Sequence, residues 1–263
     1  MRSFSSRLPG EPHRAFRSAV EAFALDLYRR ASPPDTAYFL DKTPRYALLA
    51  DEVYQAFPTA RFIVLWRNPL LVAHSIVKTW GGGHWNFQDF TIDLHDGLRH
   101  LLDFSQTHDA NVFRLRFEDL VRDPEGMVSD LLDFLEMDPD PSVTSRFSDF
   151  RFTGHEQGDP TGQFAYDTIE PGVASQPPTA FNNPYRRWKI RRWLENLPDS
   201  AWSHMGYERA NTLDLLRQGR RLHPNLVGDL STAAKIAVKC RLHRLAVNNR
   251  LYLSRERRPY LYQ

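Results

Sequence analysis

The feature that most constrains this sequence is residues 62–66, Phe-Ile-Val-Leu-Trp, a continuous apolar run of strand length. Pro58 stands shortly before the run. Asn68 and Pro69 follow it with a pattern typical of a helix start, because asparagine caps the first turn and proline suits its first position. This order predicts a strand that is buried on both faces and leads directly into a helix. Such strands belong to parallel sheets covered by helices, so the run favours an α/β fold.

Similar patterns occur on both sides of this run. Residues 37–40 predict a short buried strand, and Thr43-Pro44 predicts a helix that continues to about Phe57. Residues 113–117 alternate apolar residues with arginine and predict a further strand with one polar face. Amphipathic helices are predicted at residues 11–30, with the apolar face against the core, at 93–106, and after Asp123-Pro124. Repeated strand–loop–helix units predict a parallel sheet flanked by helices.

Length and composition limit the class of protein. A chain of 263 residues with 41% hydrophobic residues is long enough for a full core, and one main domain is expected. Cys240 is the single cysteine, which excludes an internal disulfide and a cysteine zinc site. The sequence has neither an 18-residue apolar run nor the apolar stretch of a signal peptide, so we expect no transmembrane segment and a cytoplasmic location.

Charge is distributed unevenly along the chain. Residues 211–263 contain eleven Lys and Arg against three acidic residues, a local net charge of +8 that leaves −6 on residues 1–210. We therefore predict an α/β domain over residues 1–210 and a basic helical extension over residues 211–263. The extension is interpreted as a solvated surface or a docking segment for an acidic partner, and nucleic-acid binding is not expected.

The residues that follow predicted strands are the candidates for chemistry, because ligands of parallel α/β sheets bind at the carboxyl ends of the strands. Lys42 and Arg67 occupy such positions. Ser75 lies eight residues after Arg67, in the second turn of the helix that Asn68 caps. A guanidinium and a hydroxyl beside a helix N-terminus suit a phosphate dianion. The histidines show no metal-ligand spacing, so no metal site is predicted.

Several segments resemble the sulfotransferases in the same order along the chain. Residues 62–69 followed by Ser75 resemble their 3'-phosphate-binding segment. Residues 41–45 and 56–58 are similar to bacterial sulfotransferases and, more distantly, to tyrosylprotein sulfotransferases. Residues 116–120 and 154–160, and Met205-Gly206-Tyr207, resemble later segments of the family, so that the resemblance covers roughly residues 12–210. It implies a fold of the P-loop nucleotide-binding kind.

The resemblance also implies roles for particular residues. Arg67 and Ser75 would bind the 3'-phosphate of 3'-phosphoadenosine 5'-phosphosulfate, the co-substrate, and Phe117 would lie against its adenine, at a position where the family often has tyrosine. Lys42 matches a lysine near the transferred sulfuryl group, where a cation stabilises charge on the equatorial oxygens without a metal. The implied acceptor carries a hydroxyl, as a sugar, a small alcohol or phenol, or a tyrosyl peptide.

One part of the family pattern does not occur in the sequence. Sulfotransferases hold the 5'-phosphosulfate in a P-K/R-S-G-T-T/S loop between a strand and a helix, and no such loop is found here. In tyrosylprotein-type members this loop and a glutamate base precede the helix that matches residues 12–30. We therefore expect both to lie upstream of Met1, the sheet to be incomplete with a poorly covered apolar edge, and the chain alone to be inactive.

Two other functions remain open at this point. A non-catalytic nucleotide-binding remnant, or a module that docks a partner through the basic tail, explains the same residues without transfer chemistry. A nucleotide kinase is less favoured, because the sequence has neither a Walker lysine segment nor matching metal ligands.

Overall fold

The structure is a computed structural model, and it describes residues 12–81, 84–146, 178–181, 183–218 and 225–248. The chain divides into two compact units, one of Met1–Phe62 and Asp93–Val112 and one of Ile63–Ile92 and Phe113–Gln263. The candidate phosphate ligands belong to the second unit and Lys42 to the first, so each unit is described by itself.

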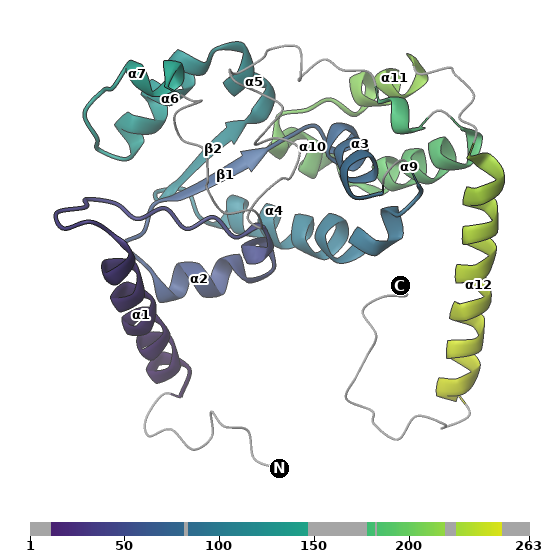
Figure 1. The fold of residues 1–263 in the computed structure, drawn as a ribbon, viewed down its shortest axis with the longest axis horizontal. Helices are drawn as coiled ribbons and strands as arrows, with labels where there is room; N and C mark the ends of the chain where they lie inside the picture. The colour runs from purple at the N-terminus through teal and green to yellow at the C-terminus, as the bar shows by residue number, and fades with distance from the viewer. Residues whose placement is uncertain (1–11, 82–83, 147–177, 182, 219–224, 249–263) are drawn as a thin grey trace. The chain divides into compact units, whose positions relative to one another are not determined.

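The second unit contains the sheet. Strands β1 (Phe62–Trp66) and β2 (Val112–Arg116), whose first residues belong to the first unit, are hydrogen-bonded neighbours and run parallel (Figure 1). They are the strands found in the described part of the chain, and the predicted α/β class with a parallel sheet is confirmed. The predicted strand at residues 37–40 is wrong, because these residues pair with neither strand of the described sheet, and Leu40 is 78% exposed.

Strand β1 is covered on one face and not on the other. Val64 and Trp66 are buried, whereas Ile63 and Leu65 are 37% and 50% exposed. The prediction of a strand buried on both faces was therefore wrong for one face. The predicted poorly covered apolar edge of the sheet stays a prediction, because these two residues lie on a face of the strand.

Helices of the second unit follow the strands as predicted. Helix α3 (Pro69–Trp80) begins at the Asn68 cap and ends at Gly81, and α6 (Pro124–Phe134) begins at Asp123, whose carboxylate accepts the Gly126 N–H at 3.0 Å. The short helix α5 (Phe117–Arg122) joins β2 to α6, and α7 (Ser142–Ser145) follows α6. Local capping signals thus fixed both helix starts.

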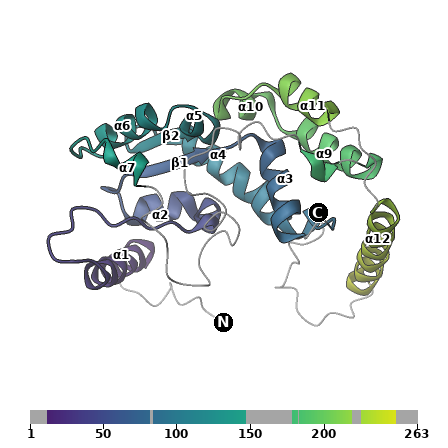
Figure 2. The ribbon, with the colours of Figure 1, turned by 45° about the horizontal axis from the view of Figure 1, so that its top comes forward.

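The later helices form a layer around α9 (Pro184–Asn196). Helix α11 (Arg209–Gln218) packs against α9, and α10 (Asp199–Met205) connects the two (Figure 2). Helix α9 also contacts α3 and therefore adjoins the helix that follows β1. Its inner residues Ile190 and Leu194 are fully buried.

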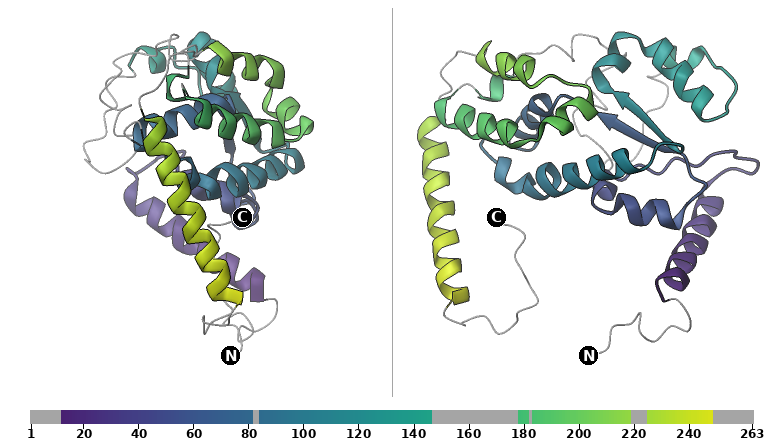
Figure 3. Two further views of the ribbon diagram at one scale, coloured as in Figure 1. Left: turned by 90° about the vertical axis from the view of Figure 1, so that its right-hand side faces the viewer. Right: turned by 180° about the vertical axis from the view of Figure 1, so that it is seen from behind.

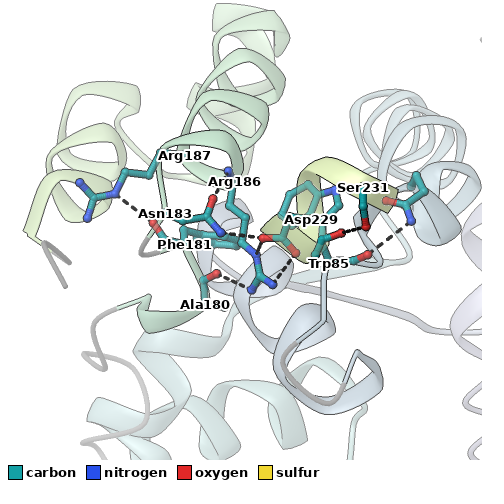
Figure 4. Close-up of polar contacts among 10 residues, drawn as sticks. Trp85, Ala180, Phe181, Asn183, Arg186, Arg187, Asp229 and Ser231 are labelled. Carbon is teal, nitrogen blue, oxygen red and sulfur yellow. Dashed lines mark hydrogen bonds and ion pairs between the residues drawn. The ribbon is translucent and has the colours of Figure 1, made fainter. Parts of the chain in front are cut away.

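Helix α12 (Leu226–Asn248) is fixed to α9 at its first turn by a buried ion pair (Figure 4). The Arg186 guanidinium, 0% exposed, donates to both carboxylate oxygens of Asp229 at 2.6 and 2.9 Å. Asn183 Nδ2 donates to the same carboxylate at 2.6 Å, and Arg186 Nη1 donates to the Ala180 carbonyl at 3.0 Å. The later turns of α12 extend away from α9 (Figure 3). The predicted boundary at residue 210 stays a prediction, but the segment beyond it has a buried anchor.

The first unit is helical. It comprises α1 (Pro12–Ala31), α2 (Ala50–Ala56), α4 (Leu98–Thr107) and the short turns Pro44–Leu49 and Ile92–Gly97, the last of which starts at the unit boundary. Tyr54 is central to its packing, with ring centroids 3.9 Å from His108 and 5.9 Å from Phe104. Helix α1 was predicted to turn its apolar face to the core, and this is wrong, because Phe16 and Phe23 are 54% and 72% exposed.

Candidate functional site

The residues that follow β1 contact the residues that follow β2. Arg67 directly follows β1 and Phe117 directly follows β2, and the Arg67 guanidinium carbon lies 4.5 Å from the Phe117 ring centroid. One residue further, a carboxylate oxygen of Glu118 accepts the backbone N–H of Asn68 at 3.0 Å. A cation over an aromatic ring is attracted by the electrons of the ring face. These contacts hold Arg67 at the carboxyl end of the sheet, where the sequence predicted it.

Asn68 is buried and caps α3. Its side-chain oxygen accepts the Leu70 N–H at 3.0 Å, and its amide nitrogen donates to the Thr212 hydroxyl at 2.9 Å. Its carbonyl accepts the Leu71 N–H at 2.9 Å, and Pro69 has no N–H. With the Asn68 N–H bound to Glu118, the first backbone donors of α3 are occupied within the protein. An anion at this end of α3 must therefore be held mainly by side chains, with the helix dipole adding to them.

Ser75 lies in the second turn of α3 and is partly exposed. The preceding residue, His74, is buried, and its Nδ1 accepts the Ala180 N–H at 3.3 Å. Burial first, and then the positive charges of Lys78 and Arg67, lower the pKa of His74 to about 4. The charge of Arg67 therefore acts on the turn of α3 that carries Ser75. A phosphate shared by Arg67 and Ser75 stays a prediction.

Phe117 is partly exposed and begins α5. The sequence predicted this ring as a support for adenine. The structure adds that the ring supports Arg67, the predicted phosphate ligand. The contact with adenine itself stays a prediction.

Lys42 lies in the first unit and is exposed. The residue before it, Asp41, accepts hydrogen bonds from the hydroxyls of Tyr28 and, at 2.8 Å, Tyr46. Partial burial raises the pKa of Asp41, but these hydrogen bonds and one from Thr43 outweigh it and lower the pKa below its usual value. The backbone that carries Lys42 is thus tied to two tyrosines. Its predicted role beside the sulfuryl group stays a prediction.

The remaining predictions concern glycine-rich residues and metals. Residues 154–160, which resemble a loop near the nucleotide, lie outside the described residues. In the part of the chain that is described, no cluster of three or more His, Cys, Asp or Glu could hold a metal ion. No helix there is long and apolar enough to cross a bilayer.

Two residues at this site were not predicted to have a role. The Tyr207 hydroxyl donates to the second carboxylate oxygen of Glu118. Tyr207 follows Gly206, whose carbonyl accepts a hydrogen bond from Arg116 Nη1 at 2.6 Å. Glu118 and Tyr207 both lie in segments that resemble the sulfotransferases, and this was the one signal in the sequence that pointed to them.

Comparison with known proteins identifies the family. The sequence profile of the sulfotransferase family matches residues 3–141, more than half of the 263-residue chain. The chain belongs to the sulfotransferase family. The match contains β1, Arg67, Ser75 and Phe117.

Two individual proteins are similar to this chain. Nodulation protein NoeE of Sinorhizobium fredii strain NGR234 is 45% identical over 42 residues, which are 16% of this chain and 10% of NoeE, so the similarity spans a small part of that relative. The sulfotransferase domain from the curacin biosynthetic pathway matches in structure with a TM-score of 0.53 and 22% identity, over 72% of this chain and 68% of that domain. At this identity the second match supports the fold.

Proposed function

We propose that this protein binds 3'-phosphoadenosine 5'-phosphosulfate through its 3'-phosphate and serves in the transfer of the sulfuryl group to a hydroxyl acceptor. The observation that carries the proposal is the position of Arg67, directly after β1 and over the Phe117 ring. A guanidinium held there offers two parallel N–H donors to a phosphate. The Ser75 hydroxyl on α3 would add a further donor.

Three roles follow for the chain's own residues. Arg67 and Ser75 bind and orient the nucleotide, and Phe117 supports both the guanidinium and the adenine. Lys42 stabilises the negative charge that spreads over the sulfuryl oxygens in the transition state. The acceptor hydroxyl, on a sugar, a small alcohol or phenol, or a tyrosyl peptide, attacks sulfur in line while its proton passes to a base outside these residues. The bond between sulfur and the 5'-phosphate oxygen breaks, and adenosine 3',5'-bisphosphate leaves with the electron pair of that bond.

Titration calorimetry with adenosine 3',5'-bisphosphate tests the nucleotide assignment. Charge-assisted, bidentate contacts are strong, so Arg67→Ala should weaken binding about 100-fold, and Ser75→Ala about 5-fold. Arg192→Ala is the matched control, because it removes an exposed arginine of α9 and should leave the affinity within about 2-fold. Equal loss in Arg67→Ala and Arg192→Ala would refute a specific phosphate site.

We also propose that these 263 residues alone do not transfer the group, because the family's loop for the 5'-phosphosulfate is not among them. Radiolabelled 3'-phosphoadenosine 5'-phosphosulfate with a panel of sugar, phenol and tyrosyl-peptide acceptors measures this directly. Binding without label transfer is the expected result. Label transfer that disappears in Arg67→Ala would contradict this part of the proposal and support the catalytic role of the site.

A further inference from the structure

The Glu118 carboxylate serves as a double hydrogen-bond acceptor. One oxygen accepts the Asn68 N–H at 3.0 Å and the other accepts the Tyr207 hydroxyl. Among the described residues, no Lys or Arg forms an ion pair with Glu118. A partly buried carboxylate costs free energy of desolvation, and here two hydrogen bonds, together with the positive charge of Arg116, offset that cost. The arrangement points to a geometric function of this side chain.

The hydrogen bond to Asn68 acts on the peptide group between Arg67 and Asn68. Because that peptide plane is rigid and includes the Arg67 Cα, fixing its N–H restrains the position from which the Arg67 side chain leaves the backbone. Phe117 follows the neighbouring strand β2 and directly precedes Glu118. Its ring centroid lies 4.5 Å from the guanidinium carbon of Arg67. Arg67 is thus constrained at its backbone by Glu118 and at its charged end by Phe117. Both constraints act just beyond the last residues of the strands.

Tyr207 constrains the other side of the same carboxylate. Its backbone is placed by Gly206, which has a φ of 76° and ends α10, and by the hydrogen bond from Arg116 to the Gly206 carbonyl. Burial first, and then the hydrogen bond and charge of Glu118, raise the pKa of Tyr207. The hydroxyl therefore remains a proton donor at physiological pH. In this way the turn after α10 determines where the Glu118 carboxylate points.

We propose that Glu118 and Tyr207 are positioning residues of the 3'-phosphate site: their hydrogen bond orients the Glu118 carboxylate, which in turn sets the Arg67 guanidinium for the phosphate. The inference rests on the proposed function, since it assumes that Arg67 binds the 3'-phosphate. Neither residue touches the nucleotide in this proposal. Their effect is on the selectivity for a nucleotide that carries a 3'-phosphate.

The test compares the affinities for adenosine 3',5'-bisphosphate and adenosine 5'-phosphate, which differ in the 3'-phosphate alone. The ratio of the two affinities measures the 3'-phosphate contacts, whereas a general loss of stability lowers both affinities together. A hydrogen bond to a charged group contributes more free energy than one between neutral groups. Tyr207→Phe, which removes one such bond, should therefore reduce the affinity ratio about 5-fold, and Glu118→Ala, which removes two, about 20-fold. Glu118→Gln keeps an acceptor for the Asn68 N–H and should retain the ratio within about 3-fold of wild type.

Asp140→Asn is the matched control. It alters another carboxylate of the same unit, which accepts hydrogen bonds from Ser142 at 2.6 and 3.0 Å and from Arg146 at 2.9 Å, and which makes no hydrogen bond to Asn68 or Arg116 among the described residues. Its thermal midpoint should fall while its affinity ratio stays within about 2-fold of wild type. This control separates the loss of a hydrogen-bonded carboxylate from the loss of the contact to the Arg67 backbone.

The outcomes separate this inference from the proposed function. If wild type prefers the bisphosphate and Tyr207→Phe keeps the full preference, the positioning role is wrong and the nucleotide site stands. Tyr207→Phe decides this even if Glu118→Ala does not fold, because it removes a single hydroxyl. If wild type binds both nucleotides equally, the proposed 3'-phosphate site fails and the positioning role fails with it. A reduced ratio in Asp140→Asn equal to that of Tyr207→Phe would also overturn the role.

Discussion

Asp229→Asn should destabilise the second unit, because Asp229 neutralises an arginine that has no access to water. Arg186 is 0% exposed and Asp229 is 3% exposed, and two hydrogen bonds of 2.6 and 2.9 Å join them. The amide of asparagine nearly preserves the shape of the side chain but removes its charge. The substitution therefore leaves the guanidinium buried with carbonyl and amide partners in place of a carboxylate.

The size of the effect follows from burial. Breaking a buried ion pair on one side typically costs about 3–5 kcal/mol, because the remaining charge stays desolvated. Two features reduce this cost here. The Ala180 carbonyl still accepts from Arg186 at 3.0 Å, and the first turn of α12 can separate from α9 and let water reach the guanidinium. We therefore expect a loss of about 3 kcal/mol in the free energy of unfolding.

Urea unfolding followed by tryptophan fluorescence measures this loss, and hydrogen exchange in α9 and α12 locates it. Asp214→Asn is the control, because Asp214 pairs with Arg217 at 2.8 Å while both side chains are more than half exposed. That variant should lose less than about 0.5 kcal/mol. If Asp229→Asn is no less stable than Asp214→Asn, the buried pair does not hold α12 on α9. The combined change Arg186→Met with Asp229→Leu should recover much of the loss, because no buried charge remains.

Three further predictions concern single residues. The pKa of His74 lies near 4 in the folded protein and about 6.5 when unfolded, so the unfolded chain binds more protons between these values and wild type should lose about 2 kcal/mol between pH 7 and pH 5. His74→Asn keeps an acceptor for the Ala180 N–H but cannot bind the proton. Urea midpoints at the two pH values should show that this variant loses less stability than wild type, and an equal loss in both proteins would contradict the role of His74. Gly206→Ala should cost about 2 kcal/mol in urea unfolding, because φ is 76° and a Cβ would meet Arg116 Cδ at 3.0 Å, and an unchanged midpoint would argue against that strain. Asp123→Ala removes the cap of α6 and should lower the free energy of unfolding by about 1 kcal/mol, whereas Asp130→Ala on the same helix should change it by less than about 0.5 kcal/mol; equal losses would exclude the capping explanation.

The elements with strong local signals were predictable from the sequence. Strand β1 is the apolar run itself, and the Asn68 and Asp123 caps lie where their side chains meet N–H groups two or three residues ahead. The errors concern burial, which depends on distant parts of the chain. Residues 37–40 are apolar enough for a strand, but a strand exists only where another strand pairs with it. The periodicity of α1 indicated which face is apolar, and it could not indicate whether anything covers that face.

The same limit explains what was missed at the candidate site. The position of Arg67 follows from the end of β1 and was predictable. Its contact with Phe117 and the link from Asn68 to Glu118 join residues fifty apart, and Tyr207 is 89 residues from Glu118. No periodicity within one element encodes such pairs, because they arise from the alignment of two strands and a turn that meet only in the folded chain.

That alignment also limits which changes of length the site can tolerate. Arg67 faces Phe117 and Asn68 faces Glu118, so both contacts depend on the same register of β1 against β2. Residues inserted into the connection between the strands would leave this register unchanged. A slip of one residue would instead bring Glu118 opposite Arg67, and its carboxylate would neutralise the guanidinium. The same side chains would then form an internal ion pair, and the end of the sheet would no longer attract an anion.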